Sequence, residues 1–182
     1  MHTSAGPPRT APRAVLFDRD GTIVVDVPYN GDPALVRAMP GAREVLDGLR
    51  SRGIPVGVVT NQSGIARGLI TREQVDAVNA RVEELLGPFD VWELCPHGSE
   101  DGCTCRKPGP GMVLAASARL GLDAADVAVI GDIGADMGAA AAAGAQAVLV
   151  PTGITLQDEI RSAPAVARTL AEAVDALWTV TP

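Results

Sequence analysis

The segment Ala14–Thr22, AVLFDRDGT, decides how the rest of the chain is interpreted. It begins with four consecutive apolar residues, which is typical of a strand covered on both faces, as in a parallel sheet. The run ends in two carboxylates and a glycine, so the strand delivers Asp18 and Asp20 to its carboxyl end. Side chains two residues apart on an extended segment point the same way, and this pair can share a cation or a phosphoryl group. A strand that stops in a polar turn gives the same pattern, because Asp and Gly are common in turns.

Length and charge restrict the class of protein. The 182 residues, 47% of them hydrophobic, fit one compact domain. We expect this domain at residues 14–182, after a flexible N-terminal tail at residues 1–13. The net charge of −7 argues against nucleic acid, because phosphate contacts need clustered Lys and Arg. The sequence also lacks a membrane-length apolar run and a signal-peptide pattern, so we expect a cytoplasmic protein. We further expect a monomer that acts on a small molecule.

Apolar strands alternate with helical patterns along the chain. After the first strand, strands are expected at residues 55–60, 91–94, 127–130 and 147–150. Helices are expected at residues 41–52, 71–87, 111–120 and 136–143, and around Leu170, Val174 and Leu177. Residues 23–39 have prolines and no helical period, and they are expected to form an irregular flap. Five strands with intervening helices predict an α/β fold with a doubly wound, parallel five-stranded sheet.

Polar residues follow three of the expected strands. Asp18 and Asp20 end the first, Thr60 and Asn61 the second, and Asp132 the fourth. Ligands bind at the carboxyl ends of the strands in such sheets, so we expect these side chains in one cleft. Coincidence is the alternative for any single cluster, but three coincidences would be needed to explain all of them.

These residue types favour phosphoryl transfer through a covalent intermediate. Asp18 can attack phosphorus, while Asp20 protonates the leaving alkoxide and then activates the hydrolytic water. A magnesium ion held by Asp18, Asp132 and a main-chain carbonyl at or near Asp20 would reduce the repulsion between carboxylates and phosphate. Thr60 can donate to a phosphoryl oxygen, and Lys107 supplies a positive charge.

The sequence allows two interpretations of Asp136. It can orient Lys107 or assist the metal, or it can be a first-turn acid that the helix dipole favours.

A second signal is a cluster of metal-ligand residue types. All three cysteines and the one non-terminal histidine lie within eleven residues: Cys95, His97, Cys103 and Cys105. This spacing is typical of a tetrahedral zinc site with four protein ligands, which is structural and not catalytic. A disulfide or buried free thiols are the alternatives, and the odd number of cysteines argues against the first. The zinc loop would hold Arg106 and Lys107 at the mouth of the cleft.

Together, these residues resemble the haloacid dehalogenase superfamily of phosphatases. The resemblance rests on Asp18-x-Asp20, Thr60, Lys107 and Asp132-x-x-x-Asp136, in that order. Within the superfamily, three segments resemble the D-glycero-D-manno-heptose 1,7-bisphosphate 7-phosphatases: TNQSGIARG at residues 60–68, the cysteine loop, and CRKP at residues 105–108. The histidinol-phosphate phosphatases are the sister group of that family.

The resemblance implies removal of the 7-phosphate of a small sugar bisphosphate by a Mg²⁺-dependent enzyme with a structural Zn²⁺ and no separate cap domain. It implies substrate contacts from six residues: Asp26, Tyr29, Asn61, Gln62, Ser63 and Arg106. Arg106 is expected to bind a second phosphate, or alternatively the same phosphate as Lys107. The chain departs from the pattern at Ile133, where the bacterial heptose enzymes have Lys.

Two alternative functions remain. Histidinol phosphate, or another sugar phosphate, is the alternative substrate, and Asp26 would suit the cationic part of histidinol phosphate. A receiver-type phosphorylation switch is the alternative from a different class, because receivers also use an Asp, a Thr and a Lys on a doubly wound sheet. Asp20 argues against a switch, since an acid/base two residues from the nucleophile accelerates hydrolysis of the acyl phosphate.

Overall fold

The computed structural model describes residues 10–179. Residues 1–9 of the expected N-terminal tail therefore lie outside the described residues. Its last part runs along the sheet, where the backbone N–H of Arg13 donates to the carbonyl of Asp126 over 2.7 Å. No helix among the described residues is long and apolar enough to cross a membrane.

A five-stranded parallel sheet forms the centre of the molecule, as the sequence predicts. Its strands in spatial order are β3 (Val91–Cys95), β2 (Val56–Asn61), β1 (Ala14–Phe17), β4 (Val127–Gly131) and β5 (Gln146–Leu149). The four residues of β1 are fully buried because β1 is the central strand and helices cover both faces. Val15 and Phe17 belong to the core on one face, whereas Ala14 and Leu16 belong to the core on the other.

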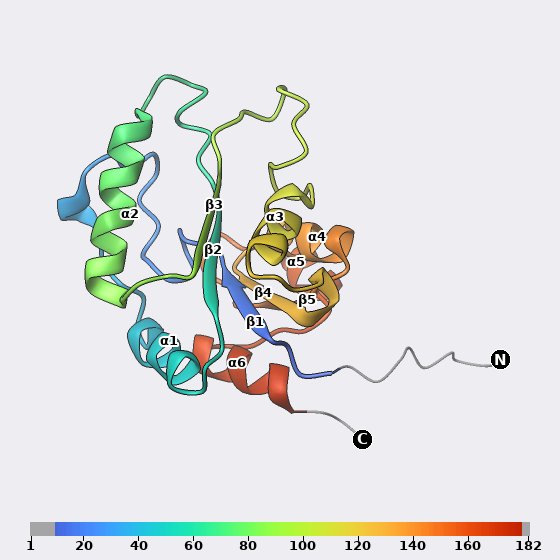
Figure 1. Cartoon of the computed structure of the whole chain (residues 1–182). Coiled ribbons are helices and arrows are strands. Elements are labelled where there is room, and N and C mark those ends of the chain that lie inside the picture. The colour runs from blue at the N-terminus through green and yellow to red at the C-terminus, as the bar shows by residue number, and fades with distance from the viewer. Residues whose placement is uncertain (1–9, 180–182) are drawn as a thin grey trace.

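Helices cover both faces of the sheet (Figure 1). One face packs against α1 (Ala42–Ser51), α2 (Arg72–Leu86) and α6 (Leu170–Trp178). The other face packs against α3 (Gly111–Arg119) and α4 (Gly134–Ala143). The structure also has a short helix, α5 (Gln157–Ser162), and 3₁₀ turns at Pro33–Leu35 and Ala124–Asp126. The sequence does not reveal α5, because it has no fully buried residue and so no apolar stripe.

The longest helix shows why these segments fold locally. The Thr71 hydroxyl accepts from the Gln74 N–H, and the Gln74 side chain accepts from the Thr71 N–H, which is a complete capping box. The buried residues of α2 recur at helical spacing: Val75, Val78, Val82 and Leu86. This apolar stripe fixes α2 beside the flap and holds one wall of the region above the strand ends.

Candidate active site

A cavity of about 290 Å³ lies at the carboxyl ends of β1, β2 and β4. Most of the expected site residues line it: Asp18, Asp20, Asp26, Tyr29, Asn61, Gln62, Ser63, Lys107 and Asp132. Thr60 and Asp136 are buried beside these residues, and hydrogen bonds join them to the lining side chains. Arg106 is not among the lining residues of this cavity. The three polar strand ends therefore come together as the strand order requires.

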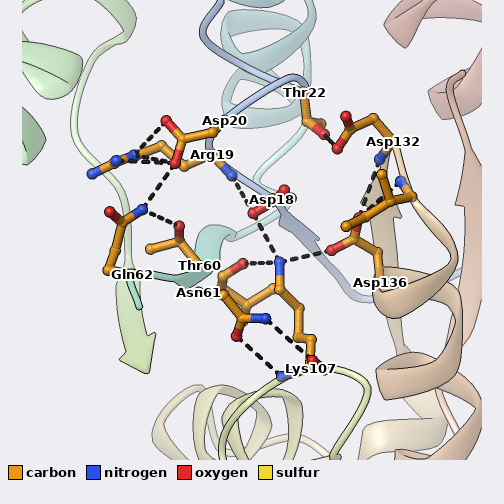
Figure 2. A network of polar contacts seen from close by, with 12 residues as sticks. Asp18, Arg19, Asp20, Thr22, Thr60, Asn61, Gln62, Lys107, Asp132 and Asp136 are labelled. Carbon is orange, nitrogen blue, oxygen red and sulfur yellow. Dashed lines mark hydrogen bonds and ion pairs between the residues drawn. The ribbon is translucent and has the colours of Figure 1, made fainter. Parts of the chain in front are cut away.

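Lys107 occupies the centre of the polar network (Figure 2). Its ammonium donates to Asp18 Oδ1 over 2.8 Å, to Asp136 Oδ1 over 2.7 Å and to the carbonyl of Val59 over 2.8 Å. The residue is only 4% exposed, and burial by itself would lower the pKa of its side chain. The two adjacent carboxylates, Asp136 and then Asp18, outweigh burial and raise the pKa. Lys107 is therefore a fixed positive charge beside the expected nucleophile.

Asp18 and Asp132 are buried carboxyl groups whose charge is incompletely compensated. Burial raises the pKa of Asp18 to about 8, although Lys107 acts in the opposite direction. Burial also raises the pKa of Asp132 to about 6, and the neighbouring charge of Asp136 adds to this. Thr22 Oγ1 donates to Asp132 Oδ1 over 3.3 Å, which holds this carboxylate towards β1. A divalent cation between these groups would favour their ionised forms.

The residues present fit a magnesium ion. Carboxylate oxygens of Asp18, Asp132 and Asp136 lie within 4.8 Å of one another. Both oxygens of Asp136 accept hydrogen bonds of 2.7 to 3.2 Å from Lys107 and the backbone, whereas Asp132 accepts longer ones of 3.3 and 3.4 Å from Thr22 and Thr152. Asp18 accepts from Lys107 and from the Arg19 N–H through Oδ1. Asp18 Oδ2 and the more weakly bonded Asp132 carboxylate are therefore the oxygens best able to bind the cation.

Gly21 has a positive φ of 80°, and a Cβ at this position would overlap the Asp132 carboxylate. The main chain that follows Asp20 thus passes directly beside Asp132, where its carbonyl oxygen can complete a set of hard oxygen ligands.

Asp136 combines both of its expected roles. Its Oδ1 accepts from Lys107, and its Oδ2 accepts from the backbone N–H groups of Asp132 and Ile133, each over 3.2 Å. The second pair of contacts satisfies N–H groups at the start of α4, as an acid in the first turn of a helix does. The residue is completely buried. Asp136 therefore connects the start of α4 to the ammonium of Lys107.

Asp20, the expected acid/base, belongs to a second network. Gln62 Nε2 donates both to Asp20 Oδ2 over 2.8 Å and to Thr60 Oγ1 over 2.9 Å (Figure 2). Because the Thr60 oxygen accepts this bond, its hydroxyl hydrogen is left for an acceptor in the cavity. Arg19 Nη2 lies 3.0 Å from Asp20 Oδ2, and Arg19 Nη1 donates to Asn79 Oδ1 on α2 over 2.7 Å.

The sequence interpretation missed Arg19 and Asn79 as parts of this network. Arg19 is only 1% exposed, which is rare for an arginine and requires the carboxylate and amide partners that it has here. Its signal in the sequence was its place between the two strand-end acids, where a cation can pair with a carboxylate; here it pairs with Asp20. Asn79 interrupts the apolar stripe of α2 between Val78 and Val82, and a polar residue at such a position needs a buried partner.

The flap contributes the outer wall of the cavity. Tyr29 has a positive φ of 52°, which non-glycine residues seldom adopt. Arg67 Nη1 donates to the Tyr29 hydroxyl over 2.9 Å, and the guanidinium lies 5.7 Å from the centre of the ring. A Cβ on Gly64 would lie 2.8 Å from the same ring, so the tyrosine packs directly against the backbone after β2. Ile133 and Ile154 also line the cavity.

Arg106 has a different position from the one expected for a ligand of a second phosphate. Its Nη1 donates to the carbonyl of His97 over 3.2 Å, and the residue lines a separate small cavity beside the cysteine loop. Its contact with a second phosphate stays a prediction.

The four expected zinc ligands converge in the cysteine loop. The Cys95 and Cys103 sulfurs are 3.7 Å apart, the Cys105 and Cys95 sulfurs 3.1 Å, and His97 Nδ1 lies 3.2 Å from the Cys105 sulfur. Tetrahedral zinc, with its usual bond lengths, separates two sulfurs by about 3.8 Å and a sulfur and a nitrogen by about 3.6 Å. The separation of Cys95 and Cys103 matches this geometry, and the other two contacts would have to lengthen by less than about 1 Å for all four ligands to surround a zinc ion. Such a site has no open position for chemistry.

Comparisons with known proteins agree with this site. A family model described as HAD-hydrolase-like matches residues 104–177. The D-glycero-β-D-manno-heptose-1,7-bisphosphate 7-phosphatase of Pseudomonas aeruginosa is 39% identical over 144 residues, which cover 76% of this chain and 81% of that protein. Its counterpart from Bordetella bronchiseptica is 37% identical over 146 residues, 78% of this chain and 82% of that protein.

Solved structures give the same result. The structure of the D,D-heptose 1,7-bisphosphate phosphatase from B. bronchiseptica, complexed with magnesium and phosphate, has a TM-score of 0.80 and 32% identity. The aligned region covers 91% of this chain and 97% of the B. bronchiseptica chain. A putative HAD-like phosphatase from Mesorhizobium loti has a TM-score of 0.75 and 38% identity, with coverage of 97% and 88%.

The parallel sheet, the paired acids after β1 and the buried Lys107 define a phosphatase of the haloacid dehalogenase class. Hydrolysis of phosphate monoesters is the chemistry of this class, and the sequence interpretation is confirmed at that level. Within the class, the chain belongs to the family of the D-glycero-D-manno-heptose 1,7-bisphosphate 7-phosphatases.

Proposed function

We propose that this enzyme removes the 7-phosphate of D-glycero-D-manno-heptose 1,7-bisphosphate through an aspartyl-phosphate intermediate. The observation that carries the proposal is the ammonium of Lys107 at 2.8 Å from Asp18 in a cavity that Asp20 and Asp132 also line. Relatives of this chain at 39% and 37% identity bear the name of this activity, which supports the proposal.

In the first step, a carboxylate oxygen of Asp18 attacks phosphorus and the bond between phosphorus and the sugar oxygen breaks. Asp20 gives its proton to the departing alkoxide. In the second step, Asp20 accepts a proton from water, the water oxygen bonds to phosphorus, and the acyl phosphate releases Asp18 and inorganic phosphate. Lys107 and the hydroxyl of Thr60 stabilise the charge on the phosphoryl oxygens in both steps.

Two metal ions belong to the proposal. Asp18, Asp132 and the main-chain carbonyl at Asp20 would hold Mg²⁺, which when bound neutralises charge on the phosphoryl oxygens and the nucleophile. The cluster of Cys95, His97, Cys103 and Cys105 would hold a structural Zn²⁺. The magnesium of the related B. bronchiseptica structure supports the first assignment, and the distances within the cysteine cluster support the second.

The charges that line the cavity bear on the choice of substrate. Arg19 and Lys107 are the cations among its described lining residues, and both are bound to carboxylates. A second phosphate would therefore need Arg106 to leave the His97 carbonyl and turn towards the cavity. Asp26 and Ile133 also line the cavity. The Asp26 carboxylate suits the cationic distal part of histidinol phosphate, and Ile133 replaces the Lys of the bacterial heptose enzymes, so histidinol phosphate is the second candidate.

We further propose that the enzyme works in the cytoplasm as a monomer, with a small phosphorylated metabolite as its partner. Nucleic acid and membrane surfaces are not proposed as partners, because the net charge of −7 opposes binding to anionic surfaces.

The test is a side-by-side measurement of phosphate release with Mg²⁺ from heptose 1,7-bisphosphate, heptose 7-phosphate and histidinol phosphate. The proposal predicts the highest kcat/KM for the bisphosphate. A clear preference for histidinol phosphate would replace the assignment by the second candidate. Stable phosphorylation of the protein without turnover of any of the three would instead favour a receiver-type switch.

A further inference from the structure

Asn61 is the last residue of β2, and its side chain binds the main chain of a residue 46 positions further along the sequence. Asn61 Nδ2 donates to the carbonyl of Lys107 over 3.2 Å, and the N–H of Lys107 donates to Asn61 Oδ1 over 3.0 Å (Figure 2). The two bonds fix the orientation of the amide, since only its oxygen accepts and only its nitrogen donates. They also satisfy both main-chain groups of Lys107 in a segment that belongs to neither a helix nor a strand.

The same strand holds the other end of Lys107. Its ammonium donates to the carbonyl of Val59, two residues before Asn61. The main chain of Lys107 is thus fixed to the end of β2, and its long, flexible side chain is fixed to the strand interior. This double attachment places the ammonium 2.8 Å from Asp18 Oδ1 and 2.7 Å from Asp136 Oδ1.

We propose that Asn61 is a positioning residue that sets the distance between the Lys107 ammonium and the phosphoryl group on Asp18. This role differs from the substrate contact that the family resemblance implies. The inference rests on one part of the proposed function, which is that Lys107 stabilises the phosphoryl group during its transfer. It does not depend on which alcohol is the leaving group. Small displacements of a catalytic group weaken transition-state stabilisation strongly, whereas they change the binding of the remainder of the substrate little.

The variants Asn61→Ala and Asn61→Leu test this role with para-nitrophenyl phosphate and Mg²⁺. Leu keeps approximately the volume of Asn but can make neither hydrogen bond. We expect kcat to fall about tenfold to a hundredfold in both variants, as for a displaced catalytic group, with KM changed by less than about threefold. The matched control is Gln146→Ala, which removes an amide-to-carbonyl hydrogen bond of 2.8 Å far from the cavity and should leave kcat unchanged.

A double-mutant cycle with Lys107→Met separates positioning from a structural or a direct role. If Asn61 acts through Lys107, adding Asn61→Ala to Lys107→Met should lower kcat by less than about twofold more. Two results would overturn the inference: independent effects that multiply, or a raised KM with unchanged kcat, which is the mark of a direct substrate contact. Zinc content and the melting temperature, measured on each variant, separate these outcomes from loss of the fold. The wild-type substrate preference tests the heptose assignment independently, because every rate in the cycle uses an aryl phosphate.

Discussion

At the scale of single residues, two effects oppose each other on Asp18. Burial favours the neutral acid and raises its pKa to about 8, whereas the Lys107 ammonium at 2.8 Å favours the carboxylate. Only the carboxylate is a nucleophile, so the protein needs further positive charge to ionise Asp18 fully at neutral pH. The position of Asp132 beside Gly21 indicates where a cation can supply this charge.

The first prediction concerns the two acids of the opening segment. Asp18→Asn removes the nucleophile and preserves the shape of the side chain, so turnover should fall at least about a thousandfold without loss of the fold. Asp20→Asn should also be nearly inactive, but it retains Asp18, so a phosphorylated protein should accumulate with a good leaving group. Circular dichroism and intact mass spectrometry measure both results. Normal steady-state turnover in either variant contradicts the mechanism.

The second prediction is that the apparent affinity for Mg²⁺ rises with pH between pH 6 and pH 8. The pKa values of about 8 for Asp18 and about 6 for Asp132 lie above the usual range, so both carboxyl groups must lose protons when the cation binds. Below these values protons compete with the cation, and the competition fades about one pH unit above the higher value, where the affinity should become constant. Calorimetry in buffers of different ionisation enthalpy measures the released protons. An affinity that is constant from pH 6 to pH 8 is the opposing result.

At the scale of structural elements, we expect the loop between β3 and α3 to depend on the proposed metal site formed by its cysteines and histidine. Residues 96–110 contain no helix or strand, yet they carry Lys107 to the centre of the site. The hydrogen bonds of this segment include those of Asn61 and the Lys107 ammonium to the sheet, and the bond of Arg106 to the His97 carbonyl within the segment. In place of regular secondary structure, the loop has long-range hydrogen bonds and a cluster of four residues that could hold a metal ion.

The third prediction is one tightly bound zinc per chain, which Cys105→Ser removes. Loss of one of four ligands should release the ion, disorder residues 96–110 and lower kcat about tenfold to a hundredfold, because Lys107 is no longer placed. Elemental analysis and hydrogen exchange of the loop measure these effects. Ser99→Ala is the control, since it changes an exposed residue of the same loop that is not a ligand. Absence of zinc in wild-type protein purified without chelator counts against the site.

The sequence predicted the helices and strands wherever burial produces a regular pattern of apolar residues. All five strands lie within one residue of their expected bounds, because a parallel sheet requires uninterrupted apolar runs. The helix α4 begins at Gly134, two residues before its expected start, because Asp136 caps N–H groups from inside the first turn. The convergence of Asp18, Thr60 and Asp132 also followed, since strand ends meet at one edge of the sheet. The direction of Arg106 did not follow, because a side chain on an irregular loop has no periodicity to reveal it.

At the scale of the whole molecule, the negative charge of the cavity must be reconciled with an anionic substrate. The lining includes Asp18, Asp20, Asp26 and Asp132, while the lining cations are already paired. A bisphosphate can bind there only if cations are added, as a bound metal ion at the reacting phosphate and an arginine at the distal one. If Arg106 is that arginine, its side chain must leave the carbonyl of His97 to reach the distal phosphate.

The fourth prediction is that Arg106→Ala removes most of the preference for heptose 1,7-bisphosphate over heptose 7-phosphate. A guanidinium can bind a second phosphate through two hydrogen bonds, and losing that contact should raise KM for the bisphosphate about tenfold while leaving the 7-phosphate little changed. Arg119→Ala, which changes an exposed arginine paired with Glu93, serves as the control. If Arg106→Ala lowers kcat/KM for both substrates by the same factor, Arg106 contacts the reacting phosphate and not the distal one.

The most direct test of the central claim is to identify which phosphate the enzyme releases from heptose 1,7-bisphosphate. Phosphorus NMR with Mg²⁺ distinguishes the two esters and inorganic phosphate in a single sample. The account predicts that the signal of the 7-phosphate disappears, inorganic phosphate appears in equal amount, the 1-phosphate remains, and excess EDTA stops the reaction. Release of the 1-phosphate, or an inert bisphosphate beside rapid hydrolysis of histidinol phosphate, would contradict it.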